Sequence, residues 1–340
     1  MVEGNGAAPS PGAADDVVLA IRDLKVSFPT EDGPVQAVRG IDLDVKAGEL
    51  VAIVGESGSG KSVSMLAVMG LLPKGAEITG SAKILGTELL GSSARSQRSV
   101  RGKRIAMIFQ DPLSALNPVH RVGDQIGEMI SAHNPKMGKK ERLDRSVELL
   151  DMVGIPQPGD RVRRYPHEFS GGMRQRVMIA MAIANDPEVL IADEPTTALD
   201  VTVQAQILEV IQRVQKELKS AVVFITHDLG VVARIADRVQ VMYAGRAVER
   251  AGVDDLYAQP THPYTVGLMN AIPQIGKASL TPIPGAPPNM LRPPTGCAFR
   301  ARCAHAEAVC ADDPPPDLRR VGIVETACRR AEELLGVLQT

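Results

Sequence analysis

A glycine-rich loop that ends in lysine and serine carries the clearest chemistry in this chain of 340 residues. The loop follows the apolar run 50–54 and opens a helix-like segment, which is the strand–loop–helix context of a phosphate-binding loop. Its glycines let backbone N–H groups wrap around phosphates, and the helix N-terminus adds positive potential. Lys61 is placed to reach the β- and γ-phosphates and Ser62 to hold Mg²⁺, so the loop predicts binding of Mg-ATP. Its residues are Gly55, Glu56, Ser57, Gly58, Ser59, Gly60, Lys61 and Ser62.

A second apolar run, 189–192, ends in the two acids Asp193 and Glu194. Asp193 stands at the expected carboxyl end of a buried strand, where P-loop ATPases hold Mg²⁺ with an aspartate. Glu194 then stands where a carboxylate can polarise an attacking water as a general base. The alternative is a strand followed by an acidic helix cap. Together with the loop, the pair predicts ATP hydrolysis.

Between these two segments lies the triplet Ser170, Gly171 and Gly172, followed by a helical pattern. With this triplet the chain resembles the ATP-binding subunits of ABC transporters, whose signature is Ser-Gly-Gly at a helix start. The resemblance implies an α/β P-loop NTPase fold with a RecA-like core, an antiparallel β subdomain and an α-helical subdomain at about 115–185. It also implies a head-to-tail pair, in which the signature of one chain caps the γ-phosphate bound by the other.

Other positions of that family match single residues of this chain. Gln110, after the expected strand 105–109, resembles the glutamine that senses Mg²⁺ and couples to membrane subunits. Asp200 resembles the aspartate of the D-loop, and His227 the switch histidine that contacts the γ-phosphate. Phe28 falls where the family places an adenine-stacking aromatic, and core packing is the alternative for it. A structural histidine at a strand end is the alternative for His227.

The resemblance spans about residues 17–335 and narrows to the branch of dipeptide, oligopeptide and nickel importers. The segments 110–118 and 262–265 are typical of this branch, and the tail 296–303 favours its peptide members. It implies a peripheral ATPase on the cytoplasmic face of the inner membrane. The implied partners are a second ATPase subunit (copy or paralogue), two membrane-spanning permease subunits and, indirectly, an extracytoplasmic substrate-binding protein. Nickel or another small solute stays open as the substrate.

All four cysteines, Cys297, Cys303, Cys310 and Cys328, lie in the last part of the chain. Disulfides are uncommon in cytosolic proteins, and the close cysteine spacing of zinc sites is absent here. Four cysteines satisfy a 4Fe–4S cluster, and the resemblance to peptide-importer subunits with such a tail implies one. Zinc and free thiols remain alternatives. His305 is expected to be a surface residue rather than a ligand.

Composition and charge exclude several other classes of protein. The net charge of −2 disfavours a dedicated nucleic-acid binder, and no nucleic-acid partner is expected. The longest central apolar run, 177–184, is far shorter than the ~20 residues of a membrane span. A soluble ABC ATPase outside transport is disfavoured because the chain has one cassette and no long coiled coil. A silent nucleotide-binding regulator is disfavoured because the residues for hydrolysis are all present.

Periodicity divides the chain into three parts. Residues 1–15 predict a disordered leader, because they are small and polar and offer no core. Residues 16–260 predict the nucleotide-binding domain, in which buried strands at 50–54, 189–192 and 221–226 alternate with helices, as in a parallel sheet. Residues 261–340 predict an irregular, proline-rich extension that contains the cysteines.

Overall fold

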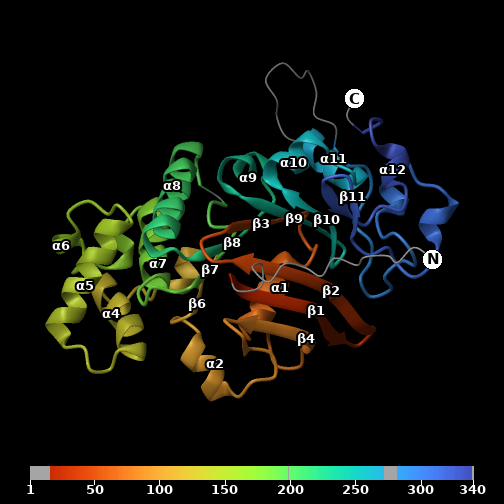
Figure 1. The fold of residues 1–340 in the computed structure, drawn as a ribbon. Helices are drawn as coiled ribbons and strands as arrows, with labels where there is room; N and C mark the ends of the chain where they lie inside the picture. The colour runs from red at the N-terminus through yellow and green to blue at the C-terminus, as the bar shows by residue number, and fades with distance from the viewer. Residues whose placement is uncertain (1–15, 198, 272–281, 339–340) are drawn as a thin grey trace, which may run out of the picture.

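A computed structural model describes residues 16–197, 199–271 and 282–338 of the chain. Most of the described elements belong to two sheets and the helices around them (Figure 1). The predicted leader 1–15 lies outside the described residues, as does Ala198 next to the predicted D-loop aspartate.

The larger sheet has eight strands in the order β11-β12-β10-β9-β3-β8-β7-β6. Strands β9, β3, β8, β7 and β6 run parallel to one another, and β10, β12 and β11 continue the sheet in antiparallel fashion. The strands are β3 (Leu50–Val54), β6 (Ile105–Ile108), β7 (Val189–Asp193), β8 (Ala221–Thr226), β9 (Arg238–Tyr243), β10 (Arg246–Gly252), β11 (Arg319–Val321) and β12 (Val324–Thr326).

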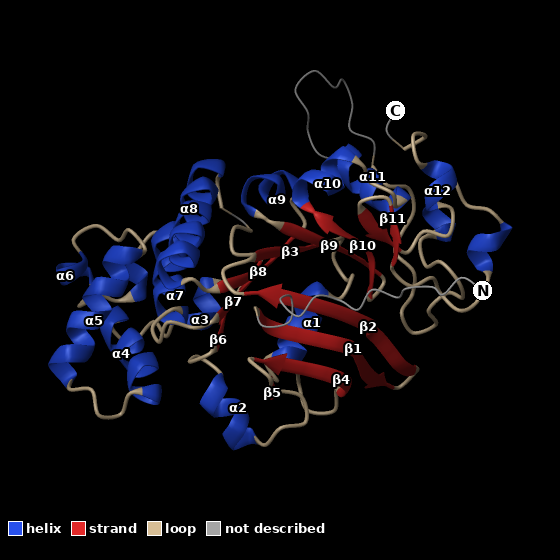
Figure 2. Cartoon of the chain, viewed as in Figure 1, coloured by secondary structure: helices blue, strands red, loops and turns tan. Residues whose placement is uncertain are grey.

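The smaller sheet is antiparallel, with the order β2-β1-β4-β5. It comprises β1 (Val17–Thr30), β2 (Gly33–Lys46), β4 (Glu77–Ile84) and β5 (Thr87–Glu88). Strand β2 is continuous and pairs with β1 along a long hairpin. Figure 2 shows this sheet packed below the larger one, with helix α1 (Lys61–Val68) between them.

The apolar side chains of the larger sheet divide between its two faces. In β3, Leu50, Ala52 and Val54 belong to one core and Val51 and Ile53 to the other. This is the period-2 alternation of a strand, with both faces covered as in a buried parallel sheet. One core lies against the antiparallel sheet and α1, and the other lies under the helices.

A group of helices extends from the β6 end of the larger sheet (Figure 1). Its members are α3 (Pro112–Ala115), α4 (Val122–His133), α5 (Lys139–Met152), α6 (Pro158–Arg161) and α7 (Gly171–Ala182). Ile126 and Ile130 of α4 pack into the same core as Leu149 and Leu150 of α5, because the spacing places each pair on one helix face. These helices occupy the stretch at which the sequence predicted a helical subdomain.

Four further helices flank the larger sheet or follow it, and one lies beside the antiparallel sheet. They are α8 (Val201–Leu218), α9 (Leu229–Ile235), α10 (Val253–Ala258), α11 (Pro263–Asn270) and α2 (Ala94–Val100). No helix within the described residues is long and apolar enough to cross a membrane.

The C-terminal region packs onto the main core instead of forming a separate tail. Its strands β12 and β11 lengthen the larger sheet through β10, where Glu249 pairs with Thr326. Short elements follow one another in it: 3-10 turns at Arg300–Arg302 and Ala308–Ala311, and helix α12 (Ala331–Leu334). This region contributes to the main core, because Phe299 and Tyr264 are buried in the core under the helices. The domain boundary at 260/261 stays a prediction.

Candidate nucleotide site

The phosphate loop lies between β3 and α1, as the sequence predicted, and two of its glycines are required by close contacts. A Cβ atom on Gly55 would lie 2.2 Å from the carbonyl oxygen of Met242, and one on Gly60 would lie 2.5 Å from that of Ala37. Gly60 also has a φ of +98°, a left-handed conformation that favours glycine. The first N–H groups of α1 have no acceptor within their own helix, so they remain available for an anion.

Lys61 and Ser62 begin helix α1 and face the end of β7. The Lys61 ammonium is buried and donates to the carbonyl oxygens of Gly55 (2.8 Å) and Glu56 (3.0 Å). Burial lowers the pKa of this ammonium, while the carboxylates of Glu194 and Asp193 oppose the change. The Ser62 hydroxyl donates to Oδ1 of Asp193 at 2.7 Å, although the two residues are far apart in the sequence.

The residues around Ser62 fit a magnesium ion and a phosphate. Hydroxyl and carboxylate oxygens, as in Ser62 and Asp193, are the ligands that Mg²⁺ takes from proteins. Burial raises the pKa of the Asp193 carboxyl, and the hydrogen bond from Ser62 opposes this shift. Ser59 Oγ in the same loop is buried and has no hydrogen-bond partner within the described residues. An unpaired buried hydroxyl is costly, so a ligand oxygen at this place would stabilise the loop.

Glu194 is the centre of a second cluster at the same edge of the sheet. Its Oε2 accepts from Thr197 Oγ1 at 2.9 Å and from Gln110 Nε2 at 3.4 Å, and it lies 3.5 Å from His227 Nδ1. Gln110 follows β6, Glu194 follows β7 and His227 follows β8, so the three meet because parallel strands end at one edge. Sequence reasoning did not find Thr197, whose only signal is its position three residues after Glu194.

The backbone of Glu194 has a strained conformation. Its φ is +46°, in the left-handed region that non-glycine residues rarely adopt. Its N–H donates to the carbonyl oxygen of Ile225 on β8 at 3.0 Å, which holds this turn against the neighbouring strand. The carboxylate is thereby directed toward Gln110 and His227 rather than along the chain.

The triplet Ser170–Gly172 lies at the N-terminus of α7, away from the phosphate loop of its own chain. Ser170 Oγ caps the helix by accepting from the N–H of Met173 at 3.3 Å. A Cβ on Gly172 would lie 2.6 Å from Val203 of α8, whereas Gly171 has open space around its α-carbon. Within the described residues, no hydrogen bond joins this helix end to the loop 55–62.

The remaining two predicted residues lie near other parts of the cassette. Asp200 caps α8 by accepting from the N–H of Val203 at 3.0 Å. Phe28 lies near the end of β1, opposite Val35 of β2, and packs half-buried against the core between the sheets. Both readings of Phe28, adenine stacking and core packing, therefore stay predictions.

Comparison with known proteins identifies the family. A family model described as "ABC transporter" matches residues 38–197, and one described as "Oligopeptide/dipeptide transporter, C-terminal region" matches residues 248–310. The oligopeptide transport ATP-binding protein OppD of Salmonella typhimurium is 49% identical over 330 residues, covering 96% of this chain and 97% of that protein. This chain belongs to the ABC transporter ATP-binding family.

Other relatives place this ABC chain in the same branch. OppD of Mycobacterium tuberculosis is 54% identical and covers 94% of this chain, but the chain spans only about half (53%) of that relative's length. The dipeptide transport ATP-binding protein DppD of Bacillus subtilis is 52% identical over 86% of this chain and 88% of that protein. A dimeric ATP-binding cassette solved with ADP and phosphate matches with a TM-score of 0.62 and 26% identity, over 69% of this chain and 98% of that one. The predicted ABC ATPase fold is thus confirmed.

The ABC cassette has an unexpected connection between its phosphate loop and its cysteine segment. Both oxygens of the Glu56 carboxylate accept from Arg302, at 2.6 and 2.9 Å, and the Glu56 N–H donates to the Tyr264 hydroxyl at 2.8 Å. Arg302 stands directly before Cys303, so the cysteine segment contacts the phosphate loop. No pattern in the sequence indicated this pairing, since the partners are separated by most of the chain.

All four cysteines of the ABC chain line one small cavity next to Arg330. Burial raises the pKa of the thiols of Cys297 and Cys303, and it raises that of Cys328 to about 12. The donor set is thus gathered in one place, as four-cysteine ligation requires. Within the described residues, however, no group of three or more side chains has the spacing of a metal site.

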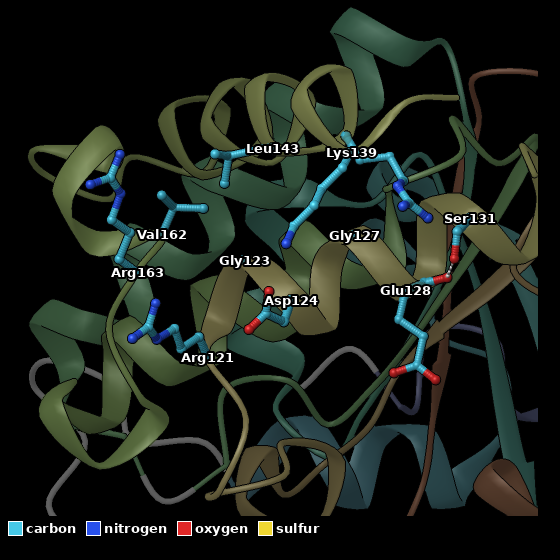
Figure 3. Close-up of a pocket in the computed structure, with 11 residues that line it drawn as sticks. Arg121, Gly123, Asp124, Gly127, Glu128, Ser131, Lys139, Leu143, Val162 and Arg163 are labelled. Atoms are coloured by element: carbon cyan, nitrogen blue, oxygen red, sulfur yellow. Dashed lines mark hydrogen bonds between the residues drawn. The ribbon is translucent and has the colours of Figure 1, made fainter. Parts of the chain in front are cut away.

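A separate groove of about 560 Å³ opens on the helical part of the ABC chain, between α4 and α5 (Figure 3). Basic side chains from three segments line it, Arg121, Lys139 and Arg163, together with the acidic Asp124 and Glu128 of α4. None of the predicted nucleotide residues lines this groove.

Proposed function

We propose that this chain hydrolyses Mg-ATP as one ATPase subunit of an importer for dipeptides or oligopeptides. The observation that carries the proposal is the meeting of Glu194 with Gln110 and His227 beside the Ser62–Asp193 pair. These groups stand at the ends of adjacent strands, next to a loop whose helix N-terminus favours phosphates.

Each group has a separate task in hydrolysis. Ser62 and Asp193, together with Gln110, would hold Mg²⁺, which would neutralise charge on the phosphates when bound. Lys61 moves from the carbonyl oxygens of the loop to the phosphate oxygens. Glu194 accepts a proton from the attacking water, and His227 contacts the γ-phosphate and orients that carboxylate.

The composite site requires a second cassette. Ser170, Gly171 and Gly172 form the N-terminus of α7, which favours an anion, and Gly171 has open space that lets a phosphate approach. A head-to-tail pair places this helix end over the nucleotide of the neighbour, with Asp200 at the junction. The second cassette is a copy of this chain or a paralogue.

Two membrane-spanning permease subunits are the other proposed partners, at the cytoplasmic face of the inner membrane. The segment directly after Gln110 exposes Leu113 and Val119, whose relative exposures are 62% and 74%. Apolar side chains so close to the catalytic cluster suit a contact that reports partner movement to Gln110. An extracytoplasmic binding protein supplies substrate without touching this chain.

Peptides are favoured as the substrate because the relatives that cover most of this chain are named for oligopeptide or dipeptide transport. The test is to purify the chain from membranes with its co-purifying subunits and to measure ATP-dependent uptake of a labelled dipeptide. Competition by unlabelled peptides, and none by nickel, supports the proposal. ATP-dependent uptake of nickel instead would overturn the substrate and leave the ATPase role intact.

The four cysteines are proposed to hold a 4Fe–4S cluster. Cys297, Cys303, Cys310 and Cys328 converge on one cavity, and cysteines bind metal by losing their thiol protons to it. A cluster bound by these four residues cross-links the C-terminal segment, whose helices and strands are short, so its role is structural. Iron analysis of anaerobically purified protein tests it.

A further inference from the structure

Among the described residues, Glu56 is the one residue of the phosphate loop that the C-terminal region contacts through both its side chain and its backbone. Its carboxylate accepts two hydrogen bonds from Arg302, and its N–H donates to the hydroxyl of Tyr264. A bidentate guanidinium–carboxylate pair fixes orientation as well as distance, and charge-assisted hydrogen bonds are about twice as strong as neutral ones. The position of Glu56 is therefore set from outside the nucleotide fold.

All five N–H donors of the Arg302 guanidinium have acceptors, and these hydrogen bonds hold the side chain in place. Besides Glu56, its N–H groups have acceptors in Pro284 (2.9 Å), Ile283 (3.4 Å) and the hydroxyl of Tyr243 (3.3 Å). Only 5% of its side chain is exposed. The guanidinium also lies against the rings of Tyr243 and Phe299, 5.8 and 5.9 Å from their centroids. A buried arginine with all five donors satisfied is rigid, because no alternative position offers the same partners.

Three aromatic residues pack behind the Glu56–Arg302 pair, and they come from three different segments of the chain. Tyr243 ends β9, Tyr264 lies in α11 and Phe299 precedes Arg302. Their ring centroids are 4.6 to 5.3 Å apart, and all three are buried. Edge-to-face and tilted aromatic contacts of this kind add to the stabilisation from burial. Movement of the segment 297–303 would therefore be transmitted to Glu56.

Glu56 in turn contacts the groups that bind phosphate. Its carbonyl oxygen accepts from Lys61 Nζ at 3.0 Å and from the N–H of Ser59 at 3.2 Å. Glu56 thus connects Arg302 and Tyr264 to Lys61 and to the turn of the phosphate loop. A loop that is already shaped for its ligand binds more tightly, because less ordering remains to be done on binding.

We propose that Arg302 and Tyr264 are positioning residues for the phosphate loop, through which the cysteine segment sets the affinity for nucleotide. The proposal rests on the proposed ATPase function. Neither residue touches the reacting atoms, and both act through Glu56.

The test measures the Kd of the full-length chain for Mg-ATP and for ADP by isothermal titration. Arg302→Ala is expected to raise both Kd values about tenfold, which corresponds to about 1.4 kcal/mol. Tyr264→Phe removes one hydroxyl and keeps the ring, so about a threefold rise is expected from the loss of one neutral hydrogen bond. Arg302→Lys keeps the charge but not the bidentate geometry, and it should fall between Arg302→Ala and the unchanged chain.

A double-mutant cycle separates this role from general destabilisation. Because Arg302 acts through Glu56, the pair Glu56→Ala with Arg302→Ala should raise Kd no more than the larger single effect. The matched control is Arg320→Ala, which removes an exposed arginine of the same region whose side-chain hydrogen bond goes to the carbonyl oxygen of Gly322 and not to the loop or the cysteines. Its Kd should stay within about twofold.

The other possible results would overturn either the positioning role or the proposed function. Equal rises for Arg320→Ala and Arg302→Ala, additive losses in the cycle, or an unchanged Kd for Arg302→Ala would overturn the positioning role. If Arg302→Ala does not fold, Tyr264→Phe and Arg302→Lys decide the question by the same measurements. Failure of the unchanged chain to bind Mg-ATP would instead overturn the proposed function.

Discussion

The Glu194 carboxylate lies 3.5 Å from Nδ1 of His227 across the ends of β7 and β8. This distance places the proposed general base and the proposed γ-phosphate sensor within reach of one water molecule. Because Glu194 also accepts from Gln110, a residue that follows β6 contacts the same carboxylate. In the proposed mechanism, hydrolysis and coupling to the partner subunits therefore involve this one carboxylate.

Glu194→Gln should leave nucleotide affinity nearly unchanged and lower the steady-state rate by about 10² to 10⁴. The amide cannot accept the proton of the attacking water, while the loop 55–62 is untouched. Phosphate release by the assembled transporter and nucleotide titration are the two measurements. Glu209→Gln, an exposed residue of α8, is the matched control and should hydrolyse ATP normally. Normal turnover by Glu194→Gln would remove this residue from the mechanism.

Activity should depend on pairing of two cassettes, because Ser170–Gly172 act on the nucleotide of a neighbour. The rate per chain should rise with protein concentration, or on addition of the partner subunits. A mixture of Lys61→Ala chains with Ser170→Arg chains rebuilds at most one intact composite site, so it should exceed either variant alone. A dilute monomer with full activity would contradict the head-to-tail arrangement.

Acidification should destabilise the fold through His262, which is fully buried in the contact between α11 and the core. Burial lowers its pKa to about 4, whereas the unfolded chain protonates it near 6.5. Between these values the unfolded state binds more protons, so the free energy of unfolding falls as the pH falls. The total loss is about 3 kcal/mol, of which about 2 kcal/mol appears by pH 5.

His262→Asn is the variant that isolates this effect. The His262 ring accepts from the N–H of Tyr264 at 3.1 Å as a helix cap, and asparagine caps helices well. Denaturant unfolding at pH 7 and pH 5 should show a smaller pH dependence in the variant. Burial raises the pKa of the nearby Glu249 carboxyl. Glu249 is present in both proteins, so it contributes to the pH dependence of both. An identical pH dependence in the two proteins would contradict the prediction.

Anaerobically purified protein should be brown and contain about four irons per chain. Replacing any one of Cys297, Cys303, Cys310 or Cys328 by serine should bleach it and make the region after residue 290 sensitive to protease. Because Arg302 lies within the same segment, nucleotide affinity should fall as well. His305→Gln, at the edge of the cysteine cavity, should keep the colour. A colourless preparation with stoichiometric zinc, or with four titratable thiols, would overturn the cluster.

Local patterns were enough to predict the elements that carry the nucleotide motifs. The apolar runs 50–54 and 221–226 became β3 and β8 with the predicted limits, because strands buried on both faces need continuous apolar sequence. One of the helices predicted to alternate with these strands is α8, which Asp200 caps. The candidate residues after these strands also came close together, since parallel strands share one carboxyl edge.

The tertiary structure alone decided what lies behind the phosphate loop. Neither the type nor the spacing of Glu56, Tyr264 and Arg302 marks them as partners, because contacts between distant segments depend on how a sheet and its helices pack. The same holds for Glu249, whose buried carboxylate accepts from Thr261 and so fastens the C-terminal region to β10. The sequence by itself determined the loop, the acids and the strand edge that joins them. Packing of the C-terminal region decided that a cysteine-lined segment holds that loop, since burial of a charged pair requires partners that no local pattern specifies.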